Sequence, residues 1–223
     1  MFRKGVIHTM KIICSKSSLL KSVSIALKAV PSKTTMPILE CILMDATTNQ
    51  IKFTTNDMEL GIETIVEGTI EEKGKVALDA KIFYEIIRRL PDNDVTIKTD
   101  DKYAATITCE KAKFNIPGKS GEDFAYLPMI EKDEPLTISQ YTLKEMIRQT
   151  IFSIAVNENN KLMTGELFEI KNNCLKVVSL DGHRISIRKM SLKKDYSDRK
   201  VVVPGKTLSE VSKILSGEVD DQV

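Results

Sequence analysis

The chain has 223 residues, of which 42% are hydrophobic and 29% are charged. This balance excludes a disordered chain, so we expect one or two globular domains. The apolar runs are too short for a signal peptide or a membrane-spanning helix, so we expect the protein in the cytoplasm. The net charge of +2 excludes nucleic-acid binding through total charge, so any such binding must depend on where the basic residues lie.

The cysteines are far apart in the sequence and include no Cys-x-x-Cys pair. They are Cys14, Cys41, Cys109 and Cys174. This spacing indicates neither a zinc site nor a disulfide framework. We expect buried, reduced thiols.

The first predicted elements are an alternating strand that starts at Met10 and a helix over Ser17–Val30. Apolar residues at helical spacing occupy one face of this helix, which Pro31 ends because helical geometry is disfavoured before a proline. The strands that follow are bounded by Thr, Asn or Gly turns and cover Leu39–Asp45, Ile51–Thr55, Gly61–Val66 and Lys75–Leu78. A second helix is predicted over Ala80–Leu90, and its inward residues are Ile82, Phe83, Ile86 and Leu90.

The second half of the chain repeats this pattern at an interval of about 124 residues. Asp181 follows Asp57 by 124 residues, and each stands just after a predicted strand. Further residues match in the same order at nearly constant spacing: Leu20-Lys21 with Leu143-Lys144, and Lys75, Lys81, Glu85 and Leu90 with Lys200, Lys206, Glu210 and Leu215. A duplicated domain explains these matches more simply than coincidence, and predicts helices over Leu143–Ile154 and Lys206–Leu215.

The predicted fold is therefore α+β, with two copies of a domain in which two helices pack on antiparallel sheets. The domains cover residues 10–131 and 135–223, and the charged segment Glu131–Pro135 joins them. The second copy has only Ser216–Val223 after its second helix, whereas the first continues to Pro128. We therefore expect the second domain to be incomplete and the chain to be a fragment of a longer protein.

All four predicted helices carry lysine or arginine on the face opposite their apolar residues. For a single helix, ordinary solvation accounts for such residues. Their recurrence predicts a positive surface that suits a phosphate backbone. Because Glu85 and Glu210 reduce its charge, binding should be weak and salt-sensitive.

Two Gly-Lys segments look like phosphate-binding loops but lack a glycine that such loops need. That glycine stands five residues before the Gly-Lys pair; Lys200 occupies this position for Gly205-Lys206-Thr207, and Lys113 for Gly118-Lys119-Ser120. We expect the first segment to be a strand-to-helix turn. No nucleophile motif or carboxylate cluster is present either, so no catalytic residue, metal or cofactor is predicted.

Asp181-Gly182-His183-Arg184 lies between two alternating segments, which is typical of a hairpin turn. The turn can be the whole role of these residues. Alternatively, His183 and Arg184 line a groove for a partner.

Several segments resemble the bacterial sliding clamp family, the beta subunit of DNA polymerase III. They lie in family order from Met10 to the end of the chain: Met10-Lys11-Ile12, Met36-Pro37-Ile38-Leu39, Thr55-Asn56-Asp57-Met58-Glu59, Phe124 to Pro128 and Leu180-Asp181-Gly182-His183-Arg184-Ile185. The resemblance implies tandem DNA-clamp domains, three in each family member, with two full-length chains closing as a homodimer ring around duplex DNA. The third domain would be absent from this chain.

The resemblance also implies the site residues. Those facing DNA would be basic helix residues, one basic loop residue and three residues of a second loop: Lys21, Lys28, Lys33, Lys81, Arg88, Lys144, Arg148, Asn157, Lys161, Leu162, Lys206 and Lys213. The family's pocket for short partner peptides maps onto Met163, Leu180, Gly182, His183, Arg184 and Ile185.

The implied function is that of a processivity factor, a non-catalytic subunit that tethers a polymerase by encircling DNA. The implied partners are duplex DNA, the DNA polymerase III catalytic subunit, the clamp loader and other proteins with clamp-binding motifs. One alternative is a duplicated α+β scaffold for protein interactions that does not bind DNA. A more distant alternative is a nucleotide-binding enzyme that uses Gly205-Lys206-Thr207.

Overall fold

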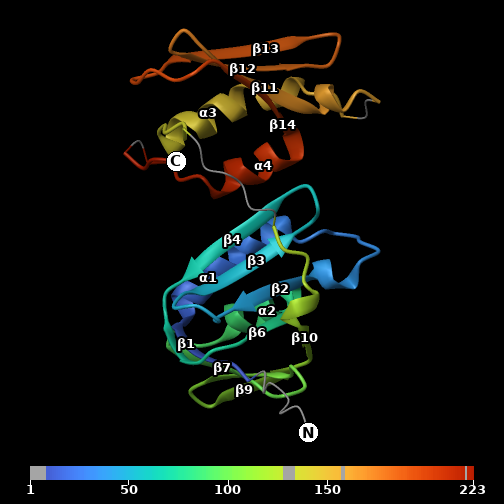
Figure 1. Ribbon diagram of the computed structural model, residues 1–223, viewed down its shortest axis with the longest axis vertical. Coiled ribbons are helices and arrows are strands. Elements are labelled where there is room, and N and C mark those ends of the chain that lie inside the picture. Colours follow the sequence, from blue (N-terminus) through green and yellow to red (C-terminus); the bar gives the residue numbers. More distant parts are fainter. Residues whose placement is uncertain (1–8, 128–133, 157–158, 219) are drawn as a thin grey trace, which may run out of the picture. The chain divides into compact units, whose positions relative to one another are not determined.

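The computed structural model describes residues 9–127, 134–156, 159–218 and 220–223. The chain divides into two compact units, residues 1–128 (unit 1) and 129–223 (unit 2). In each unit, two α-helices pack with antiparallel sheets, which confirms the predicted α+β class (Figure 1). Residues 131–133 of the predicted linker lie outside the described residues. Within the described ranges, no helix is long and apolar enough to cross a membrane.

Unit 1 contains two five-stranded sheets. The first has the order β5 (Thr69–Glu72), β1 (Lys11–Ser15), β7 (Asp94–Thr99), β8 (Ala105–Cys109) and β9 (Ala112–Ile116). The second has the order β10 (Gly118–Ser120), β6 (Lys75–Asp79), β2 (Cys41–Asp45), β3 (Ile51–Asn56) and β4 (Gly61–Val66). The short 3-10 turns of unit 1 are η1 (Leu27–Ala29), η2 (Pro37–Glu40) and η3 (Gly121–Asp123).

The helices of unit 1 begin at side-chain caps. Helix α1 covers Lys16–Ala26, and the Ser15 hydroxyl accepts a hydrogen bond from the Ser18 amide at 3.2 Å. Helix α2 covers Ala80–Arg89, and the Asp79 carboxylate accepts from the Ile82 amide at 2.8 Å. Such caps satisfy amides that have no partner inside the helix, which explains where each helix starts. The predicted first helix ended at Val30, whereas α1 gives way to the tighter turn η1 after Ala26.

One prediction for helix α2 is wrong. Ile82 was expected to face inward, but it is 51% exposed, whereas Ile87 is fully buried. The buried residues Ala80, Phe83 and Ile87 recur at spacings of three and four, and Ile82 lies about 100° around the helix from Phe83. The core is centred on Phe83, whose ring meets that of Phe53 edge to face at 6.1 Å.

Unit 2 contains one four-stranded sheet and two helices. The sheet order is β13 (Ile185–Ser191), β12 (Cys174–Leu180), β11 (Gly165–Lys171) and β14 (Arg199–Pro204). The helices and 3-10 turns are α3 (Gln140–Thr150), η4 (Ile151–Ser153), η5 (Lys161–Thr164) and α4 (Gly205–Ile214). Helix α3 starts three residues before the predicted Leu143, directly after its N-cap Ser139. Both helices lie on one side of the sheet (Figure 1).

The internal repeat is also visible in the hydrogen bonds. In unit 1 the Thr55 hydroxyl donates to the carbonyl of Ala26, and in unit 2 the Ser179 hydroxyl donates to the carbonyl of Thr150. Each bond spans 29 residues and ties a strand to the end of the unit's first helix. The two units are therefore copies of one structural plan.

All four cysteines are free. Cys14, Cys41 and Cys109 are buried as predicted, while Cys174 is only half-buried. Burial raises the pKa of the Cys14 thiol to about 12, so it stays protonated near neutral pH.

Candidate nucleic-acid interface and partner site

Unit 1 presents exposed basic side chains on its helices. Lys21 of α1, Lys28 of η1 and Lys81 of α2 are all exposed, and within the described part of the chain no carboxylate pairs with them. Arg88 is exposed too, but its guanidinium lies 2.7 Å from the Glu85 carboxylate, as in many pairs one turn apart on a helix. Three of the four predicted contacts on these elements are therefore available to an anion without breaking an ion pair.

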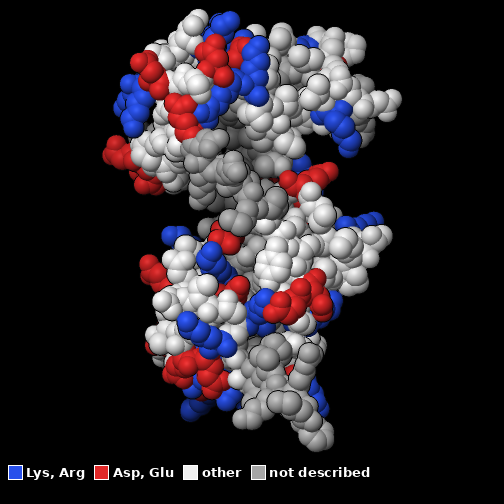
Figure 2. Space-filling model, in the orientation of Figure 1, with Lys and Arg blue, Asp and Glu red and all other residues white. Residues whose placement is uncertain are grey.

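Charge is unevenly divided within unit 1. Residues 1–128 include 18 basic and 17 acidic residues. Six basic and one acidic residue fall in 16–29 and 80–89, which leaves 12 basic and 16 acidic residues elsewhere. Helix α1 lies behind β3 and β4 in Figure 1, so Figure 2 views unit 1 from its strand side, where acidic and basic side chains intermingle. Elements α1, η1 and α2 thus hold the excess positive charge of this unit.

Lys33 lies in the exposed segment between η1 and η2, outside any helix. This position agrees with the loop placement that the sequence implied. Its contact with DNA remains a prediction.

In unit 2 one predicted basic residue is not displayed as expected. Lys144 of α3 is half-buried, and its ammonium donates to the carbonyl of Leu215 at 3.0 Å. That carbonyl is one of those left without an intrahelical partner at the end of α4, so the lysine caps the neighbouring helix. The spacing along α3 alone did not reveal this contact.

The other basic helix residues of unit 2 are exposed. Arg148 pairs with Glu145 at 2.7 Å, and Lys213 pairs with Glu210 at 2.6 Å. Lys206 is exposed at the start of α4. These pairs leave less uncompensated charge on the helices of unit 2 than on those of unit 1.

The second candidate DNA loop is described in part. Lys161 and Leu162 are exposed in η5, and the Asn160 side chain accepts a hydrogen bond from the Leu162 amide at 3.1 Å. Asn157 lies outside the described residues. The exposure of Lys161 suits a phosphate contact.

The Asp-Gly-His-Arg segment forms the predicted hairpin turn between β12 and β13. The Asp181 carboxylate accepts from the amides of His183 at 3.0 Å and Arg184 at 3.1 Å, and from Nε of Arg184 at 2.8 Å. The hydrogen bond from the His183 amide and those from Arg184 lower the pKa of Asp181. Gly182 adopts a φ of 86°, which glycine reaches without the strain that a side chain would impose.

The predicted peptide-pocket residues of unit 2 lie close together around this turn. A Cβ atom at Gly182 would lie 4.0 Å from Cε of Met163, and Leu180 pairs directly with Ile185 across the two strands. Leu180 and Ile185 are 38% and 59% exposed, so the turn is bordered by accessible apolar surface. The structure therefore brings the predicted residues into one patch; their binding role remains a prediction.

The first Gly-Lys segment is the strand-to-helix turn that was predicted. Strand β14 ends at Pro204 and α4 begins at Gly205. A Cβ atom at Gly205 would lie 2.9 Å from the carbonyl oxygen of Thr164, so close packing explains the glycine. Among the described residues, no group of three or more His, Cys, Asp or Glu side chains could hold a metal ion.

The sequence missed an apolar hollow at the edge of unit 1. It has a volume of about 340 Å³, and Ile82, Ile86 and Phe114 line it together with charged residues of α2. Phe114 is 40% exposed on β9, which is the last strand of its sheet. The sequence did contain one sign of this hollow. Ile82 lies next to the buried Phe83 on the helix, so helical spacing places it on a different face from Phe83, and an isoleucine on an outer face indicates an apolar surface.

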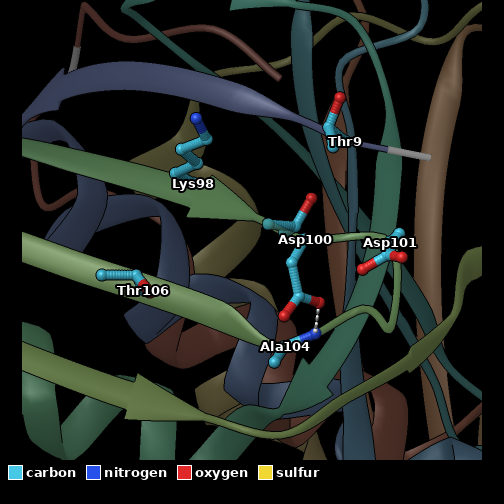
Figure 3. A pocket seen from close by; sticks show the side chains of 7 residues that line it. Thr9, Lys98, Asp100, Asp101, Ala104 and Thr106 are labelled. Carbon is cyan, nitrogen blue, oxygen red and sulfur yellow. Dashed lines mark hydrogen bonds between the residues drawn. The ribbon is translucent and has the colours of Figure 1, made fainter. Parts of the chain in front are cut away.

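A second hollow, of about 430 Å³, lies at the end of the β7–β8 hairpin (Figure 3). Its acidic residues include Asp100 and Asp101. The Asp100 carboxylate is engaged by the amides of Lys102 and Ala104, each at 2.9 Å. This carboxylate shapes the turn, and the hollow offers no clear binding chemistry.

Comparisons with known proteins agree with the geometry of the two units. Residues 10–128 match the family model "DNA polymerase III beta subunit, N-terminal domain", and residues 137–223 match "DNA polymerase III beta subunit, central domain". The "Beta sliding clamp" of Bacillus subtilis (strain 168) is 37% identical over 216 residues, which are 92% of this chain and 57% of that protein.

Solved structures are similar as well. A putative DNA polymerase III beta subunit from Eubacterium rectale is 67% identical with a TM-score of 0.95, over 96% of this chain and 59% of that one. The sliding clamp structure from Bacillus subtilis is 35% identical with a TM-score of 0.90, over 96% of this chain and 58% of that one. The chain thus spans less than two thirds of the length of these relatives. It belongs to the DNA polymerase III beta subunit family.

Proposed function

We propose that the protein is a DNA sliding clamp, a non-catalytic processivity factor that encircles duplex DNA and tethers the replicative polymerase in the cytoplasm. The observation that carries this proposal is the charge division of unit 1, where α1, η1 and α2 together hold six basic residues and one acidic residue. A ring is retained by its topology, so its inner surface needs only weak and mobile phosphate contacts. The near-neutral net charge of +2 is compatible with such contacts.

We propose that the clamp domains cover residues 10–131 and 135–223. Their DNA contacts would come from the basic residues on α1, η1, α2, α3 and α4, from Lys33, and from Asn157, Lys161 and Leu162. Lys144 would contribute less than the others, because its ammonium already bonds to the Leu215 carbonyl.

The patch around the Asp181 turn would receive short peptide motifs from the DNA polymerase III catalytic subunit, the clamp loader and other clamp-binding proteins. Exposed Leu180 and Ile185 offer apolar contact, while His183 and Arg184 offer polar contact from the same hairpin. A peptide that places apolar side chains in such a patch gains affinity from their burial.

The edge of unit 1 is the surface we propose for contact with a second copy of the complete protein in a homodimer ring. Among the described residues strand β9 pairs with β8 on one side only, and Phe114, Ile82 and Ile86 form an apolar centre beside Lys81, Glu85 and Arg89. An apolar centre with a charged rim is typical of protein interfaces, and an open strand edge offers backbone hydrogen bonds.

Replacing Lys21, Lys28 and Lys81 together by alanine is expected to weaken binding of this chain to duplex DNA. The salt dependence should also become shallower, by about 0.9 in the slope of log affinity against log salt for each phosphate that the variant no longer neutralises. Fluorescence anisotropy with a labelled duplex at several salt concentrations measures both. The matched control replaces the exposed Lys102, Lys111 and Lys113, which lie outside the helices. Equal weakening by the two triple variants would contradict the proposed DNA face.

Topology separates a clamp from the alternative, a protein-interaction scaffold. The complete gene product, loaded on circular DNA by its clamp loader, should remain bound at high salt and be lost when the circle is cut. A scaffold that does not bind DNA would be retained on neither form.

A further inference from the structure

Unit 2 buries a carboxyl group in its core. Glu166 of β11 is 0% exposed, and neither carboxyl oxygen has a hydrogen-bond partner among the described residues. Phe168, two positions along the strand, packs with Ile147 and Leu208 of the helices, so Glu166 lies on the same helix-facing side of the sheet. A carboxylate without a partner in such a place is strongly disfavoured, and each such group calls for an explanation.

The internal repeat shows that this carboxyl replaces an apolar residue. Glu166 follows Ile42 by 124 residues, and both occupy the second position of equivalent strands, β11 and β2. Thr150 follows Ala26 by the same interval, and these two accept the equivalent hydrogen bonds from Ser179 and Thr55. In unit 1 both Ile42 and Ala26 are fully buried in the main core. Unit 2 therefore carries a polar pair at two positions that are apolar in its sister domain.

The hydroxyl of the nearby Thr150 is committed to the backbone of its own helix. Its hydroxyl proton is donated to the carbonyl of Met146 at 2.7 Å, which leaves its lone pairs as acceptors. A protonated carboxyl can donate to those lone pairs, whereas a carboxylate would need a donor, and the Thr150 hydroxyl already donates to the Met146 carbonyl. Burial raises the pKa of Glu166 from its ordinary 4.5 to about 7, and the nearby Thr150 hydroxyl acts in the opposite direction with a smaller effect.

Among the described residues, no charged side chain on the elements around β11 compensates Glu166. On β11, β12 and β14, Glu169 pairs with Lys176 and Lys200 on the opposite face of the sheet, Arg199 pairs with Glu134, and Lys171 is exposed. On the helices and η5, the charged groups are exposed or engaged with one another or with backbone: Lys144, Glu145, Arg148, Lys161, Lys206, Glu210 and Lys213. The protonation of Glu166 is thus governed by its burial.

Glu166 and the nearby Thr150 adjoin two short elements, of which η5 carries the candidate site residues Lys161, Leu162 and Met163. Thr150 directly precedes η4, and Glu166 follows η5 after Gly165 alone. The two turns are tied together, because the amide of Ala155 donates to the carbonyl of Met163 at 2.9 Å. Turn η4 is also joined to β13 through the hydroxyls of Ser153 and Ser186 at 2.7 Å. Water that enters around Glu166 would therefore disturb η4 and η5 first.

We propose that Glu166 is a proton-controlled latch: its neutral carboxyl keeps η4 and η5 packed on β11, and its ionisation loosens both turns. The step is the loss of the carboxyl proton to bulk water, which leaves a carboxylate that draws water into the core. The folded state holds this proton up to about pH 7 and the opened state only to about pH 4.5, so stability falls as pH rises between these values. Above that window both states are ionised, and no further loss follows.

Amide hydrogen exchange of the whole chain, corrected for the intrinsic rate at each pH, tests the latch. In the unmodified chain the opening equilibrium of the amides of η4, η5 and early β11 should rise by up to about tenfold per pH unit from pH 5 to 7. Glu166→Gln, which keeps the shape but cannot ionise, and Glu166→Ile, which restores the residue type of unit 1, should abolish this rise. The exposed-carboxyl control Glu218→Gln should behave like the unmodified chain.

Amides around Ile42 in unit 1 provide an internal reference that should not change over the same pH range. A flat pH profile at η4 and η5 in the unmodified chain would overturn the latch. So would a rise that persists in Glu166→Gln, a variant that remains informative if Glu166→Ile does not fold.

Discussion

Ile87→Ala is expected to lower the free energy of unfolding of unit 1 by about 2–5 kcal/mol, the range for truncating a fully buried aliphatic side chain. Ile87 is 0% exposed and belongs to the main core, in which buried residues of both helices and both sheets of unit 1 pack together. The truncation removes apolar contacts and leaves a cavity that a densely packed core fills only in part.

The matched control is Ile82→Ala on the same helix. Ile82 is 51% exposed, so the same chemical change should alter the free energy by less than about 1 kcal/mol. Native-state hydrogen exchange of β2 and β7 amides measures both variants on unit 1 alone. Comparable losses in the two variants would mean that the buried face of α2 has been assigned incorrectly.

Ile82→Ala should still weaken self-association of the complete protein if the apolar edge is the ring contact.

Gly118→Ala is the second substitution with a large expected effect, a loss of about 1–3 kcal/mol from overpacking. A Cβ atom at Gly118 would lie 2.2 Å from the carbonyl oxygen of Tyr103, and 2.8 Å from Cγ2 of Val76. The carbonyl belongs to the backbone and cannot rotate away, so β10 must move off β6 or the Tyr103 turn must shift. Tyr103 already has a φ of 64°, which leaves its turn little freedom to adjust.

Gly217→Ala is the control, because a Cβ atom there meets no heavy atom within 4 Å. Thermal unfolding followed by circular dichroism, with amide exchange of β10, compares the two variants. A Gly118→Ala variant as stable as the unmodified chain would show that the turn yields easily. The nucleotide-binding alternative concerns a different segment, Gly205-Lys206-Thr207, and tight, saturable ATP binding measured by calorimetry would support it.

Helical periodicity and the internal repeat predicted most of the elements because both depend on residues close in sequence or on a constant offset. Strand β5, Thr69–Glu72, was not predicted. It is short and lies at the edge of its sheet, where its polar residues meet solvent and leave no alternating pattern. The early start of α3 was missed because Gln140, Tyr141 and Thr142 add no apolar stripe, although Ser139 precedes them as the N-cap.

In the candidate sites, too, the features formed by residues close in sequence were predicted, whereas those formed by distant residues were not. The Asp181 turn was readable because a hairpin is local, and its hydrogen bonds span only two or three residues. The bond from Lys144 to Leu215 spans 71 residues, so no spacing on α3 predicted it. Likewise, the apolar edge combines α2 with Phe114 of β9, and only the folded chain brings them together.

The sequence by itself determined the duplicated α+β plan, the family resemblance, the basic character of the helices and the turn at Asp181, because periodicity, repetition and turn chemistry are properties of neighbouring or regularly spaced residues. Only the tertiary structure decided which isoleucine of α2 is buried, which lysine caps a helix and that Glu166 lies in the core. These outcomes depend on what remote segments place around a side chain, since burial and hydrogen bonding are set by the neighbours that folding assembles.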